Sequence, residues 1–408
     1  MLRFLESMQF MLFVFFTAAY AYQIVYLFVG LIGKGRGGRE NAKLHRYAAV
    51  VAARNESAVI ANLIRTLKEQ NYPSELLDIY VIADNCTDNT AQISRQAGAY
   101  VYERFNKVQV GKGYALEYLF HHIFEDKGET AYDGFFVFDA DNIVDRDFVR
   151  EMNKMFDTGE YTALTSYRNS QNFCANWISA GYALWFLRES RFLNRPRTQL
   201  GVNCAVSGTG FLVSAQAVRE DAGWPYHLLT EDIQFSVHEI LQGRKVAFAP
   251  DAVLYDEQPI TFRDSWNQRF RWAKGFYQVF AHYAGGLVKG TLTNPRGYRF
   301  ACYDMLMTIA PGMLLSIISI LFNTIIIVLA ATGVMSTGVA IASSVTSVVF
   351  CLCNYIVFMF VFGVLTTFVE WDSIRTTTAK KIRYMFTFPF FMLTYIPIAL
   401  IALVKKAA

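Results

Sequence analysis

Long apolar stretches flank a more polar middle section, and they limit what this chain can fold into more than any other feature. Residues 8–32 precede the polar section, and residues 305–332, 339–368 and 384–404 follow it. Each stretch reaches the roughly 20 residues that a helix needs to cross a bilayer. Only 18% of the 408 residues are charged, against about 25% in soluble domains. The sequence therefore predicts one membrane span before the middle section and about three after it.

Basic residues near these stretches indicate which side of the membrane they face. The first stretch lacks a small-residue cleavage pattern and predicts an anchor rather than a signal peptide. Basic residues follow it and also precede the last stretch: Lys34, Arg36, Arg39, Lys43 and Arg46, then Arg375, Lys380, Lys381 and Arg383. Because cytoplasmic loops carry an excess of Lys and Arg, we expect a multi-pass protein of the cell membrane with its middle section in the cytoplasm. Pro389 and Pro397 leave a bent or re-entrant last segment as an alternative.

Charge and cysteine content exclude some classes of partner and site. A net charge of +4 is too small to argue for nucleic acid. The six cysteines show no paired metal-ligand spacing, which predicts reduced thiols without disulfides. We expect a transmembrane helix over 1–35, a catalytic domain over 40–260, interfacial amphipathic helices over 261–298 and a transmembrane region over 299–408. The sequence supports no prediction of the oligomeric state.

The middle section alternates apolar strands with amphipathic helices. Residues 47–53, 78–83 and 134–138 have the pattern of buried strands, and residues 57–70 and 89–97 that of helices. This alternation predicts an α/β domain with a doubly wound, largely parallel sheet. Ligands of such sheets bind beyond the carboxyl ends of the strands.

Three polar clusters stand at such strand ends: Arg54-Asn55-Glu56, residues 84–90, and Asp139-Ala140-Asp141. Asp84 is placed to accept hydrogen bonds from a base or a ribose, and Asp88 to cap the helix that follows. The carboxylates of Asp139 and Asp141 repel each other unless a positive charge offsets theirs. Carboxylates suit Mg²⁺ or Mn²⁺, and Mg²⁺ often bridges carboxylates to phosphates. The alternative for this pair is an exposed turn with solvated side chains.

Two glycine-containing loops follow. Gly111-Lys112-Gly113 lets the backbone approach a ligand and offers an ammonium group to phosphate, but it is not a Walker loop. Residues 207–213 form a glycine turn that leads into a strand, a candidate acceptor-side loop. Between these loops, the aromatic residues 177–192 indicate either a helix on the membrane surface or a core helix.

Two further segments carry candidate chemistry. Glu231 and Asp232 start a predicted helix, where they suit either the helix dipole behind a Thr230 N-cap or the role of a catalytic base. Residues 265–282 form an amphipathic helix. It presents Gln268, Arg271 and Trp272 on one face, where Arg grips a pyrophosphate and Trp stacks on a sugar ring. An interfacial helix with an aromatic belt is the alternative.

This order of motifs resembles the membrane-integrated family 2 glycosyltransferases, which include the cellulose, chitin, hyaluronan and poly-N-acetylglucosamine synthases. The resemblance covers residues 47–280, and the flanking spans agree in arrangement. It implies a GT-A type nucleotide-sugar domain, with a doubly wound mixed sheet, combined with transmembrane helices. Synthases of this group often carry a Cys-Gly pair where this chain has Ser207-Gly208-Thr209. Residues 371–375 loosely match a gating loop of hyaluronan-type synthases, and an interfacial Trp is the simpler interpretation.

The resemblance also implies roles for individual residues. Asp84 matches the residue that binds the uracil nucleotide, with Arg54, Glu56 and Lys112 beside the donor. Asp139 and Asp141 match the pair that holds diphosphate and Mg²⁺ or Mn²⁺. Asp232 matches the general base, next to Glu231. Gln268 and Arg271 match diphosphate-binding positions, while Trp272, Ser207, Gly208 and Thr209 shape the acceptor end.

The prediction that follows is an inverting, metal-dependent glycosyltransferase. It would use a UDP-sugar to extend a β-linked polysaccharide and pass it through its own membrane spans. In-line attack needs a base for the acceptor proton and positive charge at the leaving diphosphate. Transfer to a lipid acceptor is the alternative, and a membrane scaffold with an inactive nucleotide-sugar domain is another. Glucose, N-acetylglucosamine and glucuronate donors are not distinguished.

Overall fold

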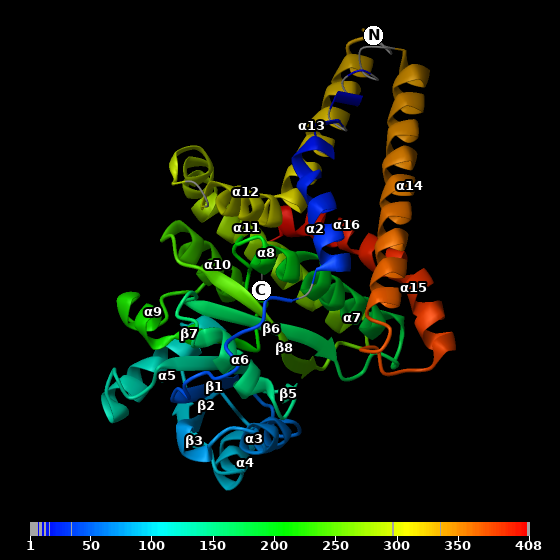
Figure 1. Ribbon diagram of the computed structural model, residues 1–408. Coiled ribbons are helices and arrows are strands. Elements are labelled where there is room, and N and C mark those ends of the chain that lie inside the picture. Colours follow the sequence, from blue (N-terminus) through cyan, green and yellow to red (C-terminus); the bar gives the residue numbers. More distant parts are fainter. Residues whose placement is uncertain are drawn as a thin grey trace.

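A computed structural model describes residues 17–33, 35–295, 298–334 and 336–405 (Figure 1). It also describes Ser7, Phe10, Met11, Val14 and Phe15. Several residues of the predicted span 8–32 therefore lie outside the described residues. The part that follows forms α2 (Tyr22–Ile32), at the end of a shorter apolar helix, Thr17–Ile32.

The middle section folds around one eight-stranded mixed sheet with the strand order β3-β2-β1-β4-β7-β6-β8-β5. Its strands are β1 (Tyr47–Ala53), β2 (Leu77–Asp84), β3 (Tyr100–Arg104), β4 (Gly134–Asp139), β5 (Ile143–Val144), β6 (Ala163–Ser170), β7 (Phe211–Ser214) and β8 (Val246–Asp256). The first four strands are parallel, as alternating strands and helices predict. In the other half β6 and β8 are also parallel, but β7 pairs antiparallel with β4 and β6, and β5 with β8, so the sheet is less parallel than expected. The α/β class with a mixed sheet is confirmed.

Helices cover both faces of this sheet (Figure 1). They are α3 (Ile60–Lys68), α4 (Thr90–Gln96), α5 (Lys112–Lys127), α6 (Phe148–Phe156), α7 (Trp177–Glu189), α8 (Arg195–Gln199), α9 (Ala215–Glu220), α10 (Glu231–Leu241) and α11 (Phe262–Thr293). Side chains alternate along a strand, so Ala48 and Val50 of β1 join the core under α5 and α7, while Ala49 and Val51 join the core under α3 and α6. Burial of α7 in the first of these cores favours the core-helix alternative for residues 177–192.

The C-terminal region consists of α12 (Tyr298–Ile309), α13 (Pro311–Ala331), α14 (Thr337–Val369), α15 (Thr378–Leu393) and α16 (Tyr395–Val404). Among the described residues, Thr337–Val369 and Thr378–Val404 are long and apolar enough to cross a membrane by length and composition alone. The expected N-terminal span and the third C-terminal span are not shown there. Pro311 starts a new helix inside the predicted stretch 305–332, as its missing N–H favours. In Figure 1, α13 and α14 project away from the body that holds the sheet.

A buried charged cluster attaches α2 to the C-terminal region. Arg197 donates to both oxygens of Asp304, at 2.7 and 3.1 Å, and the two side chains are only 2% exposed. Tyr22 and Tyr26 of α2 donate their hydroxyl groups to the same carboxylate, at 2.8 and 3.1 Å. One carboxylate on α12 thereby joins helices that are far apart in the sequence.

Replacing Asp304 by alanine should destabilise the fold strongly, because it leaves a buried guanidinium and two hydroxyl groups without their acceptor. Removing one member of a buried ion pair costs about 3–5 kcal/mol. Arg36→Ala is the matched control, since its pair with Glu160 is 46% and 43% exposed and should change stability by less than about 1 kcal/mol. Thermal unfolding in detergent measures both. Equal destabilisation by the two variants would contradict the proposed importance of the buried cluster.

Candidate active site

The predicted polar clusters gather at one edge of the sheet because the strands before them are parallel neighbours. Ala53 of β1 is in register with Ala83 of β2, and Ala52 is in register with Asp139 of β4. Arg54, at the end of β1, is exposed. The carboxyl ends of parallel strands are where such sheets bind ligands.

Asp84 is buried at this edge and already holds a cation. Arg104, in register with it on β3, donates from Nη1 to Asp84 Oδ1 at 2.6 Å and from Nη2 to the carbonyl oxygen of Gln109 at 2.8 Å. The pair fixes the end of β2 against the loop that precedes α5. Sequence reasoning missed Arg104, although its place at the end of an edge strand was readable.

Asn55 and Asp88 shape the loops on either side. Asn55 has a φ of 59°, in the left-handed region that asparagine tolerates better than most residues. Its side chain accepts a hydrogen bond from Thr87 N at 2.8 Å. Asp88 accepts from Thr90 N at 3.0 Å, at the start of α4, and from Ser57 N at 3.2 Å. Asp88 therefore connects the loop after β1 to the loop after β2. It also accepts a backbone hydrogen bond at the start of α4.

The loop after β4 is held by hydrogen bonds beneath the two aspartates. Thr209 Oγ1 accepts from Asp139 N at 2.8 Å and donates to the side-chain oxygen of Asn142. The Asn142 amide donates to Asp256 Oδ1 at 3.0 Å. Thr209 is 2% exposed. It therefore lies beneath the loop that carries Asp139 and Asp141 rather than on an open acceptor surface. Its predicted acceptor role stays a prediction.

Four carboxylates face one another around Asp141. Burial, and then the charges of Asp256, Asp139 and Glu56, raise the pKa of Asp141 to about 8. Burial and the charge of Asp139 also raise the pKa of Glu56. Crowded carboxylates with raised pKa values are what a divalent cation relieves. The residues present therefore fit Mg²⁺ or Mn²⁺, with Asp139 and Asp141 as the groups that would hold it.

Arg168 supplies positive charge behind this cluster. It is ion-paired with Asp256 and donates from Nη1 to the carbonyl oxygen of Ser207 at 2.8 Å. Ser207 in turn donates its hydroxyl to Glu189 of α7 at 2.8 Å. Arg168 and Asp256 thus join the loop after β4 to the predicted acceptor loop. Both were missed, although Asp256 ends a strand pattern just as Asp84 and Asp139 do.

Lys112 links the two acidic parts of the site. It begins α5, and its Nζ donates to Asp139 Oδ1 at 2.5 Å and to the carbonyl oxygen of Gly208 at 2.6 Å. Glu231 Oε1 lies 3.9 Å from the same nitrogen. Gly113 is required beside it, because a Cβ atom there would lie 1.9 Å from the carbonyl oxygen of Tyr226. The Gly-Lys-Gly motif therefore places an ammonium group between the candidate metal ligands and the start of α10.

Glu231 and Asp232 form the first turn of α10. Burial raises the pKa of Asp232 to about 6 and that of Glu231 to about 8, and Lys112 opposes both shifts. A Cβ atom on Gly208 would lie 3.5 Å from Asp232 Oδ2, so the predicted base faces the predicted acceptor loop. Thr230 occupies the N-cap position, but its side chain makes no capping hydrogen bond. The capping prediction is correct in position and wrong in its bond.

The helix predicted over 265–282 extends over Phe262–Thr293 as α11. The Oε1 atom of Gln268 is buried and makes no hydrogen bond in the described structure. Arg271 is exposed. The Trp272 ring packs edge-on against Tyr182 and Phe186 of α7, with centroids 5.7 and 6.1 Å apart.

Close packing joins α11 to the start of α10. A Cβ atom on Gly275 would lie 2.5 Å from the Thr230 side chain, and Gln278 accepts from Leu229 N at 3.2 Å. The structure thus brings α11 against the loop that carries Glu231 and Asp232.

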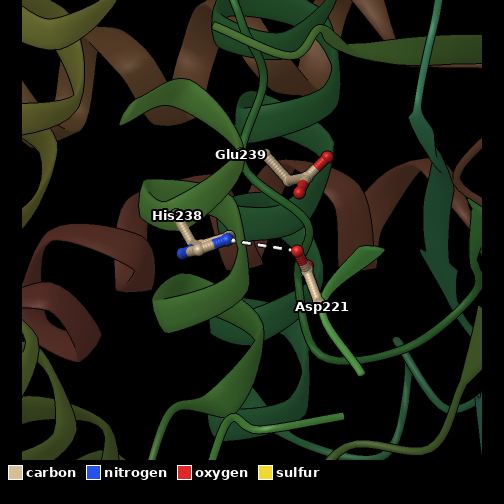
Figure 2. A group of neighbouring side chains, drawn as sticks. All are labelled: Asp221, His238 and Glu239. Carbon is tan, nitrogen blue, oxygen red and sulfur yellow. Dashed lines mark ion pairs between the residues drawn. The ribbon is translucent and has the colours of Figure 1, made fainter. Parts of the chain in front are cut away.

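A second acidic group, shown in Figure 2, is a weaker metal candidate. Asp221, His238 and Glu239 lie close together, with His238 Nε2 3.4 Å from Asp221 Oδ1. Arg244 already pairs with Asp221 at 3.0 Å and with Glu239 at 2.7 Å. The guanidinium occupies the place of a cation there, which favours a structural ion-pair network.

Comparisons with known proteins show which proteins this chain is similar to. A β-monoglucosyldiacylglycerol synthase from Synechocystis is 28% identical over 255 residues, which cover 61% of this chain and 51% of the relative. A poly-β-1,6-N-acetyl-D-glucosamine synthase from Staphylococcus epidermidis is 24% identical over 244 residues, 59% of this chain and 57% of the relative. The chain thus spans little more than half the length of these curated relatives.

The fold has a solved counterpart along its whole length. A mannosyltransferase from Pyrobaculum calidifontis, solved with GDP-mannose and Mn²⁺, superimposes with a TM-score of 0.62 at 17% identity, covering 98% of this chain and 99% of the other. This likeness shows a GT-A-like fold. The model of the family described as "Glycosyltransferase like family 2" matches residues 45–275, more than half of the chain. This chain therefore belongs to the family 2 glycosyltransferases, enzymes that use a nucleotide-sugar donor.

Proposed function

We propose that the enzyme transfers a sugar, with inversion, from a UDP-sugar to an acceptor borne by the membrane. One observation carries the proposal: Lys112 contacts both Asp139 and Gly208, while Glu231 lies 3.9 Å from its ammonium group. A leaving diphosphate needs positive charge, and an attacking hydroxyl needs a base. The two must lie a short distance apart. This site offers acids for a metal on one side and a half-buried base on the other.

Each side chain then has a definite task. Asp84 and Arg104 would hold the nucleotide end of the donor, at the edge formed by β2 and β3. Asp139 and Asp141 would hold Mg²⁺ or Mn²⁺, which supplies charge stabilisation to the leaving diphosphate when bound. Arg271, exposed on α11, is free of protein partners in the described structure and suits a phosphate oxygen. Asp232 would take the proton of the acceptor hydroxyl.

Lys112 has a part in both halves of the reaction. In the described structure its ammonium group neutralises Asp139 and lowers the pKa of Asp232, against burial. Asp232 is therefore ionised at neutral pH and ready to accept a proton, while Glu231, with its pKa of about 8, keeps its own. Two adjacent carboxyl groups with different pKa values suit an acid and a base with separate tasks.

The packing of α11 favours a lipid acceptor. Tyr277 donates to the carbonyl oxygen of Ala399 at 2.8 Å, and Arg269 donates to Thr394 Oγ1 at 2.7 Å. These bonds fasten α15 and α16 across the face of α11 beside Trp272. A polymer that passed along this face would have to displace them. One sugar added to a lipid, which diffuses in and out through the bilayer, does not require that.

Extension and export of a β-linked polysaccharide is the second candidate. The likeness to a poly-N-acetylglucosamine synthase supports it, as the glucosyldiacylglycerol synthase supports the lipid acceptor. Both candidates place α14 and the α15–α16 pair in the cell membrane, with the catalytic domain in the cytoplasm. Both share the donor chemistry and differ only in the acceptor.

The Asp232→Asn variant should lose at least about a hundredfold in the rate of sugar transfer, because the amide cannot take the acceptor proton. Steady-state transfer from UDP-glucose or UDP-N-acetylglucosamine measures the rate. Asp221→Asn, in the separate ion-pair network, is the control for loss of a buried carboxylate. A wild-type rate in folded Asp232→Asn protein would refute the assignment of the base.

The transfer rate should rise with pH through about 6 and then level off. Burial raises the pKa of Asp232 to about 6, and only the ionised carboxylate accepts a proton, so activity falls roughly tenfold per pH unit below that value. A rate profile from pH 5 to 8 at saturating donor and Mn²⁺ checks this. A rate that is independent of pH between 5 and 6.5 would contradict it.

Product size separates the two acceptors. Membranes supplied with a radiolabelled donor panel (UDP-glucose, UDP-N-acetylglucosamine, UDP-glucuronate and GDP-mannose) and Mn²⁺ or Mg²⁺ should yield a single lipid-extractable glycolipid. Chelation of the metal should abolish its formation. Labelled polymer that stays in the aqueous phase would instead support the polysaccharide synthase.

A further inference from the structure

One buried cation outside the active site has no hydrogen-bonded or ion-paired side chain among the described residues. Arg188, in the last turn of α7, is 7% exposed, and it makes no hydrogen bond or ion pair in the described structure. Its guanidinium lies over the rings of Trp185 and Phe362, 5.1 and 4.7 Å from their centroids. Burial lowers the pKa of Arg188 to about 10, so it is still charged at neutral pH. A buried charge without a partner is costly.

The segment that follows Arg188 also contains buried polar atoms without hydrogen bonds. Residues Ser190–Asn194 form a π-helix, a rare form that often marks functional sites. Arg191 Nε and Asn194 Oδ1 are buried there without a hydrogen bond, as is Arg188 Nε. Buried polar atoms normally find a partner in the protein or in bound solvent. Arg191 Nε has an ion-pair partner in Glu370, and Asn194 Oδ1 is an acceptor, so Arg188 Nε is the donor on this run that an anion would satisfy.

The nearby carboxylates are engaged elsewhere. Glu189 accepts the hydroxyl of Ser207 at 2.8 Å. Glu370 accepts from Tyr167 at 2.5 Å and from Ser373 at 3.1 Å, and it lies 3.8 Å from Arg191. The charge of Glu189 opposes the effect of burial on the pKa of Arg188, but neither carboxylate forms an ion pair or hydrogen bond with its guanidinium. The N–H groups of Arg188 therefore remain for an acceptor from outside the chain.

The helix that covers Arg188 points to where that anion comes from. Phe362 belongs to α14, which projects from the body in Figure 1 and lies beside α7. Within about a turn and a half of Phe362, α14 exposes Val357, Phe358 and Val361 by 61%, 52% and 46%. Apolar side chains exposed along a long apolar helix suit hydrocarbon better than water. An anion that reaches Arg188 along α14 would carry an apolar chain.

We propose that Arg188 binds the phosphate of an acidic membrane lipid at the junction of α7, the π-helical segment and α14. A guanidinium grips two phosphate oxygens at once, and the aromatic rings of Trp185 and Phe362 form the apolar walls. The site rests on the proposed membrane insertion of α14 and not on the transfer chemistry. Glu189, the next residue after Arg188 in α7, accepts the hydroxyl of Ser207 in the predicted acceptor loop, so one helix carries both contacts.

Thermal unfolding of the purified full chain in neutral detergent tests the site. Phosphatidylglycerol should raise the Tm of the wild-type protein by at least about 2 °C. Diacylglycerol, which has no phosphate, should not. The Arg188→Met variant should bind phosphatidylglycerol roughly tenfold or more weakly. Without lipid its Tm should equal or exceed that of the wild type, because an unpaired buried charge is gone.

Two variants serve as controls. Arg383→Met removes an exposed cation from α15 and should respond to phosphatidylglycerol like the wild type, which excludes a general effect of charge. Asp232→Asn should also keep the wild-type lipid response. The proposed lipid site and the proposed transfer chemistry are then tested independently.

The proposal is wrong if phosphatidylglycerol stabilises Arg188→Met as much as the wild type, or if diacylglycerol stabilises the wild type equally. Inorganic phosphate that reproduces the whole effect at the same concentration would identify a free anion as the ligand and overturn the lipid assignment. If Arg188→Met does not fold, native mass spectrometry of the wild-type chain decides. Preferential retention of phosphatidylglycerol over diacylglycerol supports the site, and equal retention refutes it.

Discussion

The mutual repulsion of the acids at the carboxyl edge of the sheet is the constraint on which the rest of the structure depends. Glu56, Asp139, Asp141 and Asp256 meet there because parallel strands end together. Such a cluster of carboxylates is stable only where nearby cations offset its negative charge. Lys112 and, through Asp256, Arg168 do so from the protein side, and a divalent cation with its diphosphate fits on the open side. The loops on both sides of the reaction are fastened to those same cations.

A series of charged and polar contacts extends from this cluster toward the C-terminal helices. Arg168 is joined through Ser207 to Glu189 of α7, and the residue before Glu189 is the unpaired Arg188. One continuous helical run therefore connects the acid cluster to the helix that suits hydrocarbon. In the proposed function, in which the acceptor is borne by the membrane, such a run would give the proposed lipid site and the predicted acceptor loop a common support. Arg197 and Asp304 hold the far end of this run in place.

Much of the site follows from sequence because its residues stand at strand ends. The period of apolar residues locates β1, β2 and β4, and the acids just after them must meet if those strands are parallel neighbours. Arg104, Arg168 and Asp256 were missed because local pattern shows that a strand ends at a residue but not which side chain of another strand it meets. Arg168 counts as a site residue only because β6 pairs with β8 and places it beside Asp256.

The sequence by itself determined the α/β class, the ordered acidic motifs and the apolar C-terminal region, since these depend on local periodicity and on residue chemistry. Tertiary structure alone decided which strands pair antiparallel, because the pairing of β7 depends on which strands it meets. It also decided that Thr209 lies beneath the loop that carries Asp139 and Asp141, and that Lys112 joins Asp139 to Gly208. These are contacts between residues up to 96 positions apart in the chain, and no local pattern carries the distance between two such residues.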